Sequence, residues 1–331
     1  MHRIIADTKQ AWILGLNLAL LLPIPLVSQD AKSNNSRRPS NDSEMIFWLR
    51  NMIGYHGFSP TEVELATGIQ PVDLVKLKTR LNLSKSSTAP IPPNQVFILP
   101  YPGGRHPRIG FLEGAVEPQR ETKVSVFLPW DHSSYVVADI PEAIWSNLGL
   151  TYLAHTHIPT IFDKQEKKLP KLEWDRSTKN KLFLERKLPN GITFSSTIKA
   201  QVDSVRMSMT LTNRTKQKLS DLRVQNCVML KAAKGFSQQT NDNKRFIGPY
   251  VVCHNSFKNK WIVTAWKPNH RPWANAPCPC LHSDPKFPDC LPGESKSLQG
   301  WLSFFEGKNI DQEIRRIEKL NWWKNDDSNR Q

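Results

Sequence analysis

The spacing of hydrophobic and polar positions changes several times along the chain, and each change marks a predicted boundary. An almost unbroken apolar run near the N-terminus is followed by a polar stretch without large apolar residues. Apolar residues then recur at helical spacing, and later alternate with polar ones at a period of two, which is typical of half-buried strands. These patterns predict a signal segment at 1–28, a disordered linker at 29–43, a small helical domain at 44–83, a Pro/Ser linker at 84–95, a β domain at 96–310, and a C-terminal helix and tail at 311–331.

The first apolar run extends from Ala11 to Val27 and follows the basic residues Arg3 and Lys9. It is shorter than the roughly 20 residues that a membrane-spanning helix needs. Two prolines interrupt its end ahead of the polar Ser28, as in the cleavage region of a signal peptide. The pattern predicts a secreted or periplasmic protein. The alternative is an uncleaved segment that anchors the protein in the membrane.

Three helices are predicted in the helical domain. The first covers Met45–Tyr55, where apolar residues recur at helical spacing. Ser59, followed by a proline and by Glu62, matches an N-cap with a capping box. This second helix ends at Gly68, and a third follows with an apolar stripe that we predict to be buried. The stripe comprises Val72, Leu74, Val75, Leu77 and Leu81.

Residues 58–75 resemble a helix-turn-helix, because an alanine in the first helix and a turn glycine precede an apolar residue that opens the next helix. DNA binding would require Lys76, Lys78 and Arg80 to contact phosphates. The export signal and nearby acidic residues favour a structural or protein-contact bundle instead.

The segment after residue 95 contains many short apolar-polar runs separated by turn residues. Val205–Leu211 alternates apolar and polar residues, and Leu188–Gly191 matches a tight hairpin turn. A terminal helix is predicted at Glu313–Trp323, with Ile314, Ile317 and Leu320 on one side. We predict a mainly β fold, a large antiparallel sandwich preceded by the helical bundle. Its candidate strands are 96–99, 123–128, 134–138, 182–187, 192–200, 205–212, 222–230, 250–254, 261–266 and 297–305.

Residues 191–230 resemble the central strands of galactose-mutarotase-like super-sandwich domains, in which a strand ending in Thr-Asn leads through a turn to Leu-x-x-Leu and the next strand. The sequence Pro-Gly-Glu-Ser at 292–295 and the strand after it are similar to the closing hairpin of such domains. Residues 99–307 also resemble an uncharacterised family of secreted planctomycete-type bacterial proteins. The resemblance implies a super-sandwich fold that binds or modifies carbohydrate.

The chain is strongly basic, with 45 Lys and Arg against 30 Asp and Glu and a formal charge of +15. Outside the cytoplasm such a charge points to acidic polysaccharides or anionic lipid headgroups, and we do not predict nucleic acid as a partner. The alternative is lysines scattered for solubility. The chain lacks a P-loop, a dinucleotide fingerprint and a Gly-x-Ser-x-Gly elbow, which disfavours nucleotide chemistry and the usual esterase layout.

Two predicted loops carry candidate sugar-binding or catalytic residues. The first contains Arg105, His106 and Arg108 beside paired glycines, where the arginines can hold a carboxylate or sulfate, or can simply be solvated. In the second, an extended His-x-His would direct both imidazoles to one face, which suits metal binding, acid/base catalysis or structural hydrogen bonds. Its candidates are Trp145 and Asn147 for binding and His155, His157 and Asp163 for catalysis.

A third, proline-rich loop is the favoured binding surface, because its tryptophans offer flat faces for sugar stacking and its polar groups suit hydroxyl recognition. The candidate residues are Trp266, His270, Arg271, Trp273, Asn275, His282 and Asp284.

Five cysteines in an exported chain permit two disulfides, and Cys280–Cys290 is the predicted pair. Zinc ligation by Cys278, Cys280, His282 and Cys290 is the alternative. The prolines at 277 and 279 favour an extended path that splays alternate side chains, so we predict no metal and no cofactor.

We therefore expect an exported protein that binds carbohydrate, in particular an acidic glycan. One alternative is a carbohydrate-active enzyme, a sugar epimerase, lyase or hydrolase, that uses histidine and carboxylate acid/base catalysis. The other is a structural envelope protein whose helical bundle docks a protein partner.

Overall fold

The computed structural model of the protein describes residues 36–83, 90–91, 93–110, 120–155 and 157–324. The predicted signal segment at 1–28 and part of each predicted linker lie outside these residues. Among the helices in the described ranges, none combines the length and the apolar character needed to cross a membrane.

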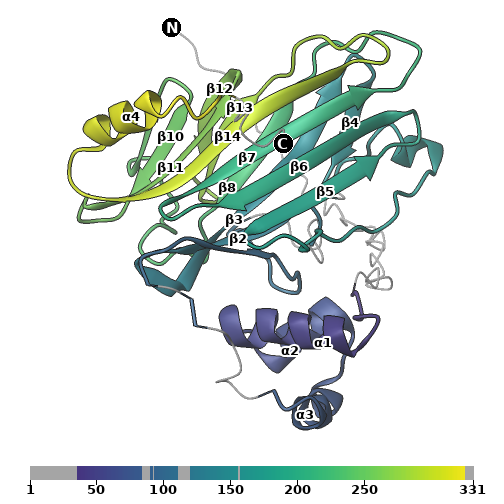
Figure 1. The fold of residues 1–331 in the computed structure, drawn as a ribbon, viewed down its shortest axis with the longest axis vertical. Coiled ribbons are helices and arrows are strands. Elements are labelled where there is room, and N and C mark those ends of the chain that lie inside the picture. Colours follow the sequence, from purple (N-terminus) through teal and green to yellow (C-terminus); the bar gives the residue numbers. More distant parts are fainter. Residues whose placement is uncertain (1–35, 84–89, 92, 111–119, 156, 325–331) are drawn as a thin grey trace, which may run out of the picture. The chain divides into compact units, whose positions relative to one another are not determined.

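Two antiparallel sheets of seven strands each form a sandwich, which confirms the predicted fold class (Figure 1). The first sheet contains β1 (Phe97–Pro100), β2 (Lys123–Leu128), β3 (Asp131–Ser146), β4 (Gly149–Leu153), β8 (Val224–Met229), β12 (Asn269–Asn275) and β13 (Cys280–Pro285). The second contains β5 (Lys181–Lys187), β6 (Ile192–Ala200), β7 (Ser204–Asn213), β9 (Lys244–Ile247), β10 (Tyr250–His254), β11 (Lys260–Lys267) and β14 (Ser295–Glu306).

The strand order explains how distant segments meet in the first sheet. Its strands run β1-β2-β3-β8-β13-β12, with β4 paired to β3, so β8 lies between strands that are far from it in sequence. The second sheet runs β5-β6-β7-β14-β11-β10-β9. Between the sheets, apolar residues such as Val124, Phe194 and Leu302 form the main core. Burial of this apolar surface stabilises the sandwich.

The periodicity predicts most strands well and fails for four of them. The predicted limits of β2, β6 and β10 match the structure, and the turn at 188–191 joins β5 to β6. Strands β4, β9, β12 and β13 were not predicted. The last two form a hairpin within the segment predicted as a proline-rich loop, and the prolines at 277 and 279 fall in its turn.

The N-terminal helices follow the predicted signals. They comprise α1 (Asp42–Leu49), the π-helical continuation η1 (Arg50–Tyr55), α2 (Pro60–Thr67) and α3 (Pro71–Arg80). Ser59 and Glu62 form the predicted capping box, and Gly68 ends α2 in the left-handed region with φ of 72°. The predicted stripe of α3 is wrong in part, because Val72 and Val75 are 63% and 66% exposed while Leu74 is buried.

Several buried polar contacts join these helices to the outer face of the first sheet. The imidazole of His56 lies 2.7 Å from Ser125 Oγ of β2 and 2.9 Å from the carbonyl oxygen of Asn51. The Asn51 side chain donates to the carbonyl of Pro100 at 2.9 Å. Arg105 pairs with Glu62 of α2. The helical segment therefore covers part of the sheet rather than standing apart from it.

The buried His56 predicts a decrease in stability on acidification. Burial, opposed by the bond with Asn51, lowers the pKa of His56 to about 3, so the imidazole is neutral in the folded protein at pH 7. An unfolded histidine binds a proton below about pH 6.5, and its contribution to stability is lost as the pH falls below that value. We expect about 2 kcal/mol less unfolding free energy from this residue at pH 5 than at pH 7.

Urea unfolding of the wild type and His56→Gln at both pH values measures this contribution. The variant is expected to show the smaller loss on acidification. Equal losses in the two proteins would contradict the prediction.

The helix α4 (Ile310–Lys319) covers part of the outer face of the second sheet, over β10, β11 and β14 (Figure 1). Ile310, Ile314 and Ile317 pack with Trp301 of β14 and with Trp322. A predicted member of this stripe, Leu320, is 46% exposed because the helix ends before it.

Candidate metal centre

Five residues form a row across five neighbouring strands of the first sheet. The register pairs Lys123 of β2 with Asp139 of β3, Asp139 with Cys227 of β8, and His282 of β13 with Trp273 of β12. Strands β8 and β13 pair antiparallel at Cys280↔Met229 and Leu281↔Val228, which brings His282 opposite Cys227. Residues paired across antiparallel strands lie on the same face, so all five side chains share one face.

This row lies on the face of the first sheet that points away from the second sheet. The neighbouring residues Val124, Ala138, Val228 and Leu281 belong to the core between the sheets. Because successive side chains of a strand point to opposite faces, the row points outward. It is nevertheless buried, since Lys123, Asp139, Cys227 and His282 are at most 2% exposed.

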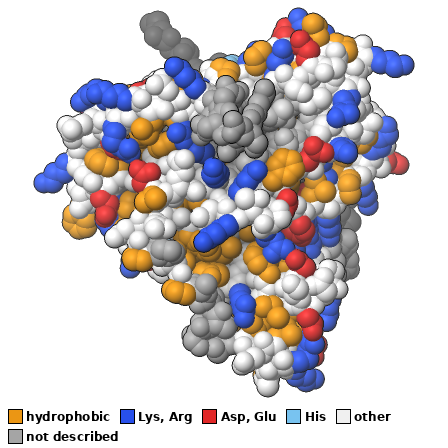
Figure 2. All heavy atoms as spheres, in the orientation of Figure 1, with side chains coloured by type: hydrophobic (Ala, Val, Ile, Leu, Met, Phe, Trp, Pro, Cys, Tyr) orange, Lys and Arg blue, Asp and Glu red, His pale blue; other side chains and the backbone are white. Residues whose placement is uncertain are grey.

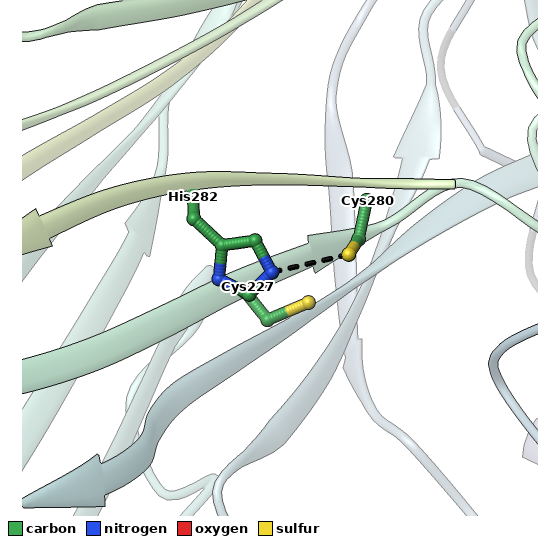
Figure 3. A group of neighbouring side chains, drawn as sticks. All are labelled: Cys227, Cys280 and His282. Carbon is green, nitrogen blue, oxygen red and sulfur yellow. Dashed lines mark hydrogen bonds between the residues drawn. The ribbon is translucent and has the colours of Figure 1, made fainter. Parts of the chain in front are cut away.

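Cys227, Cys280 and His282 bring three metal-ligating atoms together (Figure 3). The candidate ligand atoms all lie within 4.8 Å of one another, and Cys280 Sγ is 3.1 Å from His282 Nε2. The period of two along β13 puts Cys280 and His282 on the face that Cys227 shares. Thiolate and imidazole are the ligands that zinc and similar thiophilic ions prefer.

Cys278 adds a fourth candidate ligand. It lies in the turn before β13, is 4% exposed, and its thiol hydrogen-bonds to that of Cys280. The four residues then comprise a Cys3His set, which is a known composition of tetrahedral zinc sites.

The surroundings favour thiolate at Cys227 and imidazolium at His282. Burial alone would raise the pKa of the Cys227 thiol, but the Cys280 hydrogen bond and the charges of His282 and Arg108 lower that pKa to about 6. Burial likewise opposes the charge on His282, whereas the Cys227 thiolate and Glu142 raise the pKa of His282 to about 9. The Cys280 hydrogen bond lowers the pKa of Cys278 to about 7.

A chain of buried charged groups lies beside the sulfur cluster. Arg108 Nη2 is 2.7 Å from Glu142 Oε1, which is 3.1 Å from His155 Nε2. His155 Nε2 also lies 3.8 Å from Asp139 Oδ2, whose partner Lys123 Nζ is 2.8 Å away. Burial lowers the pKa of His155 to about 4. Residues from all three predicted loops thus meet around one buried cluster.

The third loop contributes to this centre but does not offer the predicted stacking surface. Trp266 is 1% exposed in the main core. Trp273 stacks on His282 at 3.9 Å between ring centroids and 11° between planes, and the Arg271 guanidinium lies 4.7 Å from its centroid. Its Nε1 donates to the buried Asp284 at 2.6 Å. The indole therefore orients His282 and Asp284 instead of presenting a clear face to a sugar.

The first loop is likewise engaged within the protein. Arg105 pairs with Glu62 and donates to Tyr135 Oη at 3.0 Å, and Arg108 is buried against Glu142. His106 Nδ1 accepts from the Arg108 amide at 3.1 Å. These arginines act as internal counter-charges.

The remaining predicted residues are spread over other parts of the fold. Asp163 accepts from Thr160 in a local turn that begins the short 3-10 helix η3 (Asp163–Gln165). Asn147 binds the backbone at 218 and 220. His157 lies 5.7 Å from His155 between ring centroids. Trp145 and Asn275 are half-buried, and His270 is exposed.

The predicted disulfide does not form, because all five cysteines are free thiols. Cys280 faces the cluster on β13, whereas Cys290 Sγ lies 3.3 Å from the carbonyl of Glu294 and its backbone pairs with Leu219. The alternative zinc site predicted from the sequence includes three of the four clustered residues, Cys278, Cys280 and His282. Its fourth member is Cys227 rather than Cys290, and the proline objection fails because the prolines lie in the hairpin turn.

No protein-family model and no curated protein matches the sequence. Solved structures give remote likenesses. A polysaccharide lyase matches at 15% identity and a TM-score of 0.30, over 42% of this chain and 23% of the lyase, so the chain spans less than a quarter of that protein. The Slr1438 protein from Synechocystis sp. PCC 6803 matches at 12% identity and a TM-score of 0.33, over 56% of this chain and 88% of that protein. A protein described as "Putative aldose 1-epimerase" from Escherichia coli K12 matches at 10% identity and a TM-score of 0.33, over 64% of this chain and 84% of that protein.

Two of these proteins are named for carbohydrate activities, a polysaccharide lyase and an aldose 1-epimerase. Likeness at this level is too weak to assign an activity.

Proposed function

We propose that the protein binds a thiophilic metal ion of the zinc class through Cys227, Cys280 and His282, with Cys278 as the fourth ligand. The observation that carries this proposal is the convergence of three ligand atoms within 4.8 Å from two paired strands. The metal would link β8, β13 and the turn before β13. Four protein ligands would close its coordination shell, which is the arrangement of structural rather than catalytic zinc.

The buried charges beside the cluster suit such an ion. A zinc ion with three thiolates and one imidazole carries one net negative charge, and a buried charge needs a partner. Arg108 is buried, and its charge favours the thiolate forms of Cys227 and Cys280. In an oxidising compartment a bound metal would also keep closely spaced thiols from pairing, which is compatible with the export that we propose from residues 1–28.

Cobalt titration of the reduced, chelator-treated full chain tests the proposal. One Co2+ ion per chain is expected, with the thiolate-to-cobalt charge-transfer absorption and intense visible bands of tetrahedral coordination. Zinc is expected to displace the cobalt and to raise the melting temperature, because it binds the folded state preferentially. Absence of stoichiometric binding, or binding without thiolate absorption, would overturn the proposal.

Binding of an acidic carbohydrate is the second candidate function. Trp145 is half-buried rather than enclosed, and the Arg223 guanidinium lies 5.9 Å from its ring centroid. An aromatic ring beside a cation suits an acidic sugar. On the face drawn in Figure 2, Lys and Arg side chains are scattered among other side chains. A glycan-array screen at low and moderate salt tests this candidate: a salt-resistant hit lost in Trp145→Ala supports it, and uniform salt-sensitive binding to all polyanions excludes it.

A further inference from the structure

A second concave site lies on the other sheet, apart from the sulfur cluster and from Trp145. It is a cavity of about 450 Å³ between the β9-β10-β11 end of the second sheet and the start of α4. The residues that line it are Arg245, His254, Lys258, Trp261, Lys308, Asn309, Ile310 and Asp311.

Cations dominate this cavity. Arg245, Lys258 and Lys308 come from a strand, a hairpin turn and the segment before α4, and all three are exposed. One carboxylate, Asp311, belongs to the lining, and its Oδ1 is 2.8 Å from Arg245 Nη2. Neither lysine forms an ion pair with any residue in the described part of the chain. Two positive charges therefore remain uncompensated within a small concave surface.

The wall and floor of the cavity are fixed. Trp261 Nε1 donates to the carbonyl of Gly307 at 2.9 Å, and the indole meets His254 edge to face at 5.1 Å between centroids. Asn309 accepts from the Gln312 amide at 3.0 Å and so caps α4. The helix begins at Ile310, and the positive end of its dipole lies in the lining. The two unpaired lysines and the N-terminal end of α4 make this cavity favourable for a ligand with a negative charge.

We infer that this cavity binds the oxyanion group, carboxylate or sulfate, of an acidic monosaccharide unit. Lys258 and Lys308 hold the oxyanion, while Trp261 and Ile310, which are 4% and 2% exposed, form the buried base of the cavity beneath it. The volume is in the usual range for small-molecule sites. The site is independent of the proposed metal centre. The choice of a sugar as the scaffold rests on the carbohydrate candidate.

Calorimetric titration of the full chain at low salt with four probes tests the inference: glucuronate, N-acetylglucosamine 6-sulfate, glucose and inorganic sulfate. The acidic sugars are expected to bind and glucose is not. Lys258→Ala and Lys308→Ala are each expected to weaken binding about tenfold, since each removes a charge-assisted hydrogen bond. Lys216→Ala is the matched control, because this exposed lysine on the β7-β8 connection lies outside the cavity and its loss changes net charge equally.

Failure of both acidic sugars to bind, or equal weakening in the Lys216 variant, would overturn the inference. Inorganic sulfate that binds as tightly as the sugars would overturn the saccharide part of it. Retention of acidic-sugar binding in chelator-treated protein would show that the cavity acts without the metal centre, so failure of the metal proposal leaves this test intact. If Trp145→Ala loses polysaccharide binding but still binds the acidic monosaccharides, the surface at Trp145 and the cavity at Lys258 and Lys308 are separate carbohydrate sites.

Discussion

Replacement of Cys280 by serine is expected to lower zinc affinity by at least about 100-fold. Loss of a residue that only hydrogen-bonds to a metal ligand already lowers affinity by up to about 100-fold, and this substitution removes a ligand itself. Cys280 is the central member of the cluster, since its thiol contacts those of Cys227 and Cys278 and lies 3.1 Å from His282. A serine hydroxyl is close in size but is a poor ligand for a thiophilic ion. Competition with a chromophoric chelator measures the change.

Cys290→Ser is the matched control for this prediction. Cys290 is also a fully buried thiol, but it bonds to Glu294 in another part of the fold. We expect this variant to keep wild-type affinity and the thiolate absorption of the cobalt form. Equal affinity in Cys280→Ser and Cys290→Ser would contradict the assignment of the ligands. The Cys278→Ser variant then shows whether Cys278 is the fourth ligand. A large loss of zinc affinity indicates four protein ligands, and an unchanged affinity indicates three protein ligands and an open coordination position.

The fold was largely predictable because its main strands alternate with period two and its helices carry explicit caps. Residues 192–200 and 205–211 show how alternation defines strands that bury one face against a core. The β12-β13 hairpin escaped prediction because His, Arg, Pro and Cys residues dominate it. Its outward face carries the polar residues Cys280, His282 and Asp284, and its inward face carries Leu281 beside Ser283, so the hairpin lacks the regular hydrophobic alternation by which a strand is found.

The centre itself was only partly predictable. Cys280 and His282 are two residues apart in sequence, and their shared face follows from a strand assignment alone. Cys227 lies far away in sequence and becomes their neighbour only through the pairing of β8 with β13. Lys123 and Asp139 join the row through two further registers. No local pattern reports a register between distant strands, which is why the sequence suggested Cys290 in place of Cys227.

The other large effect concerns the buried ion pair at the end of the row. Lys123 Nζ lies 2.8 Å from Asp139 Oδ2, and both side chains are 0% exposed. Asp139→Asn keeps the shape and an acceptor for the Thr122 hydroxyl, which lies 2.5 Å from Oδ1, but it leaves the ammonium without its counter-charge. Breaking a buried pair from one side typically costs about 3–5 kcal/mol, and we expect a loss of unfolding free energy in that range. Urea unfolding at neutral pH measures it.

The double variant Lys123→Met/Asp139→Asn separates the unpaired charge from the other effects of the change. Methionine approximates the length of the lysine side chain without its charge, so the double variant is expected to recover most of the stability that Asp139→Asn loses. A single variant within about 1 kcal/mol of the wild type, or a double variant no more stable than the single one, would contradict the prediction. Recovery would show that Asp139 serves chiefly to neutralise Lys123. The strand register places Lys123 opposite Asp139 and Asp139 opposite Cys227, so the lysine next to the thiol cluster would then need the aspartate as its counter-charge.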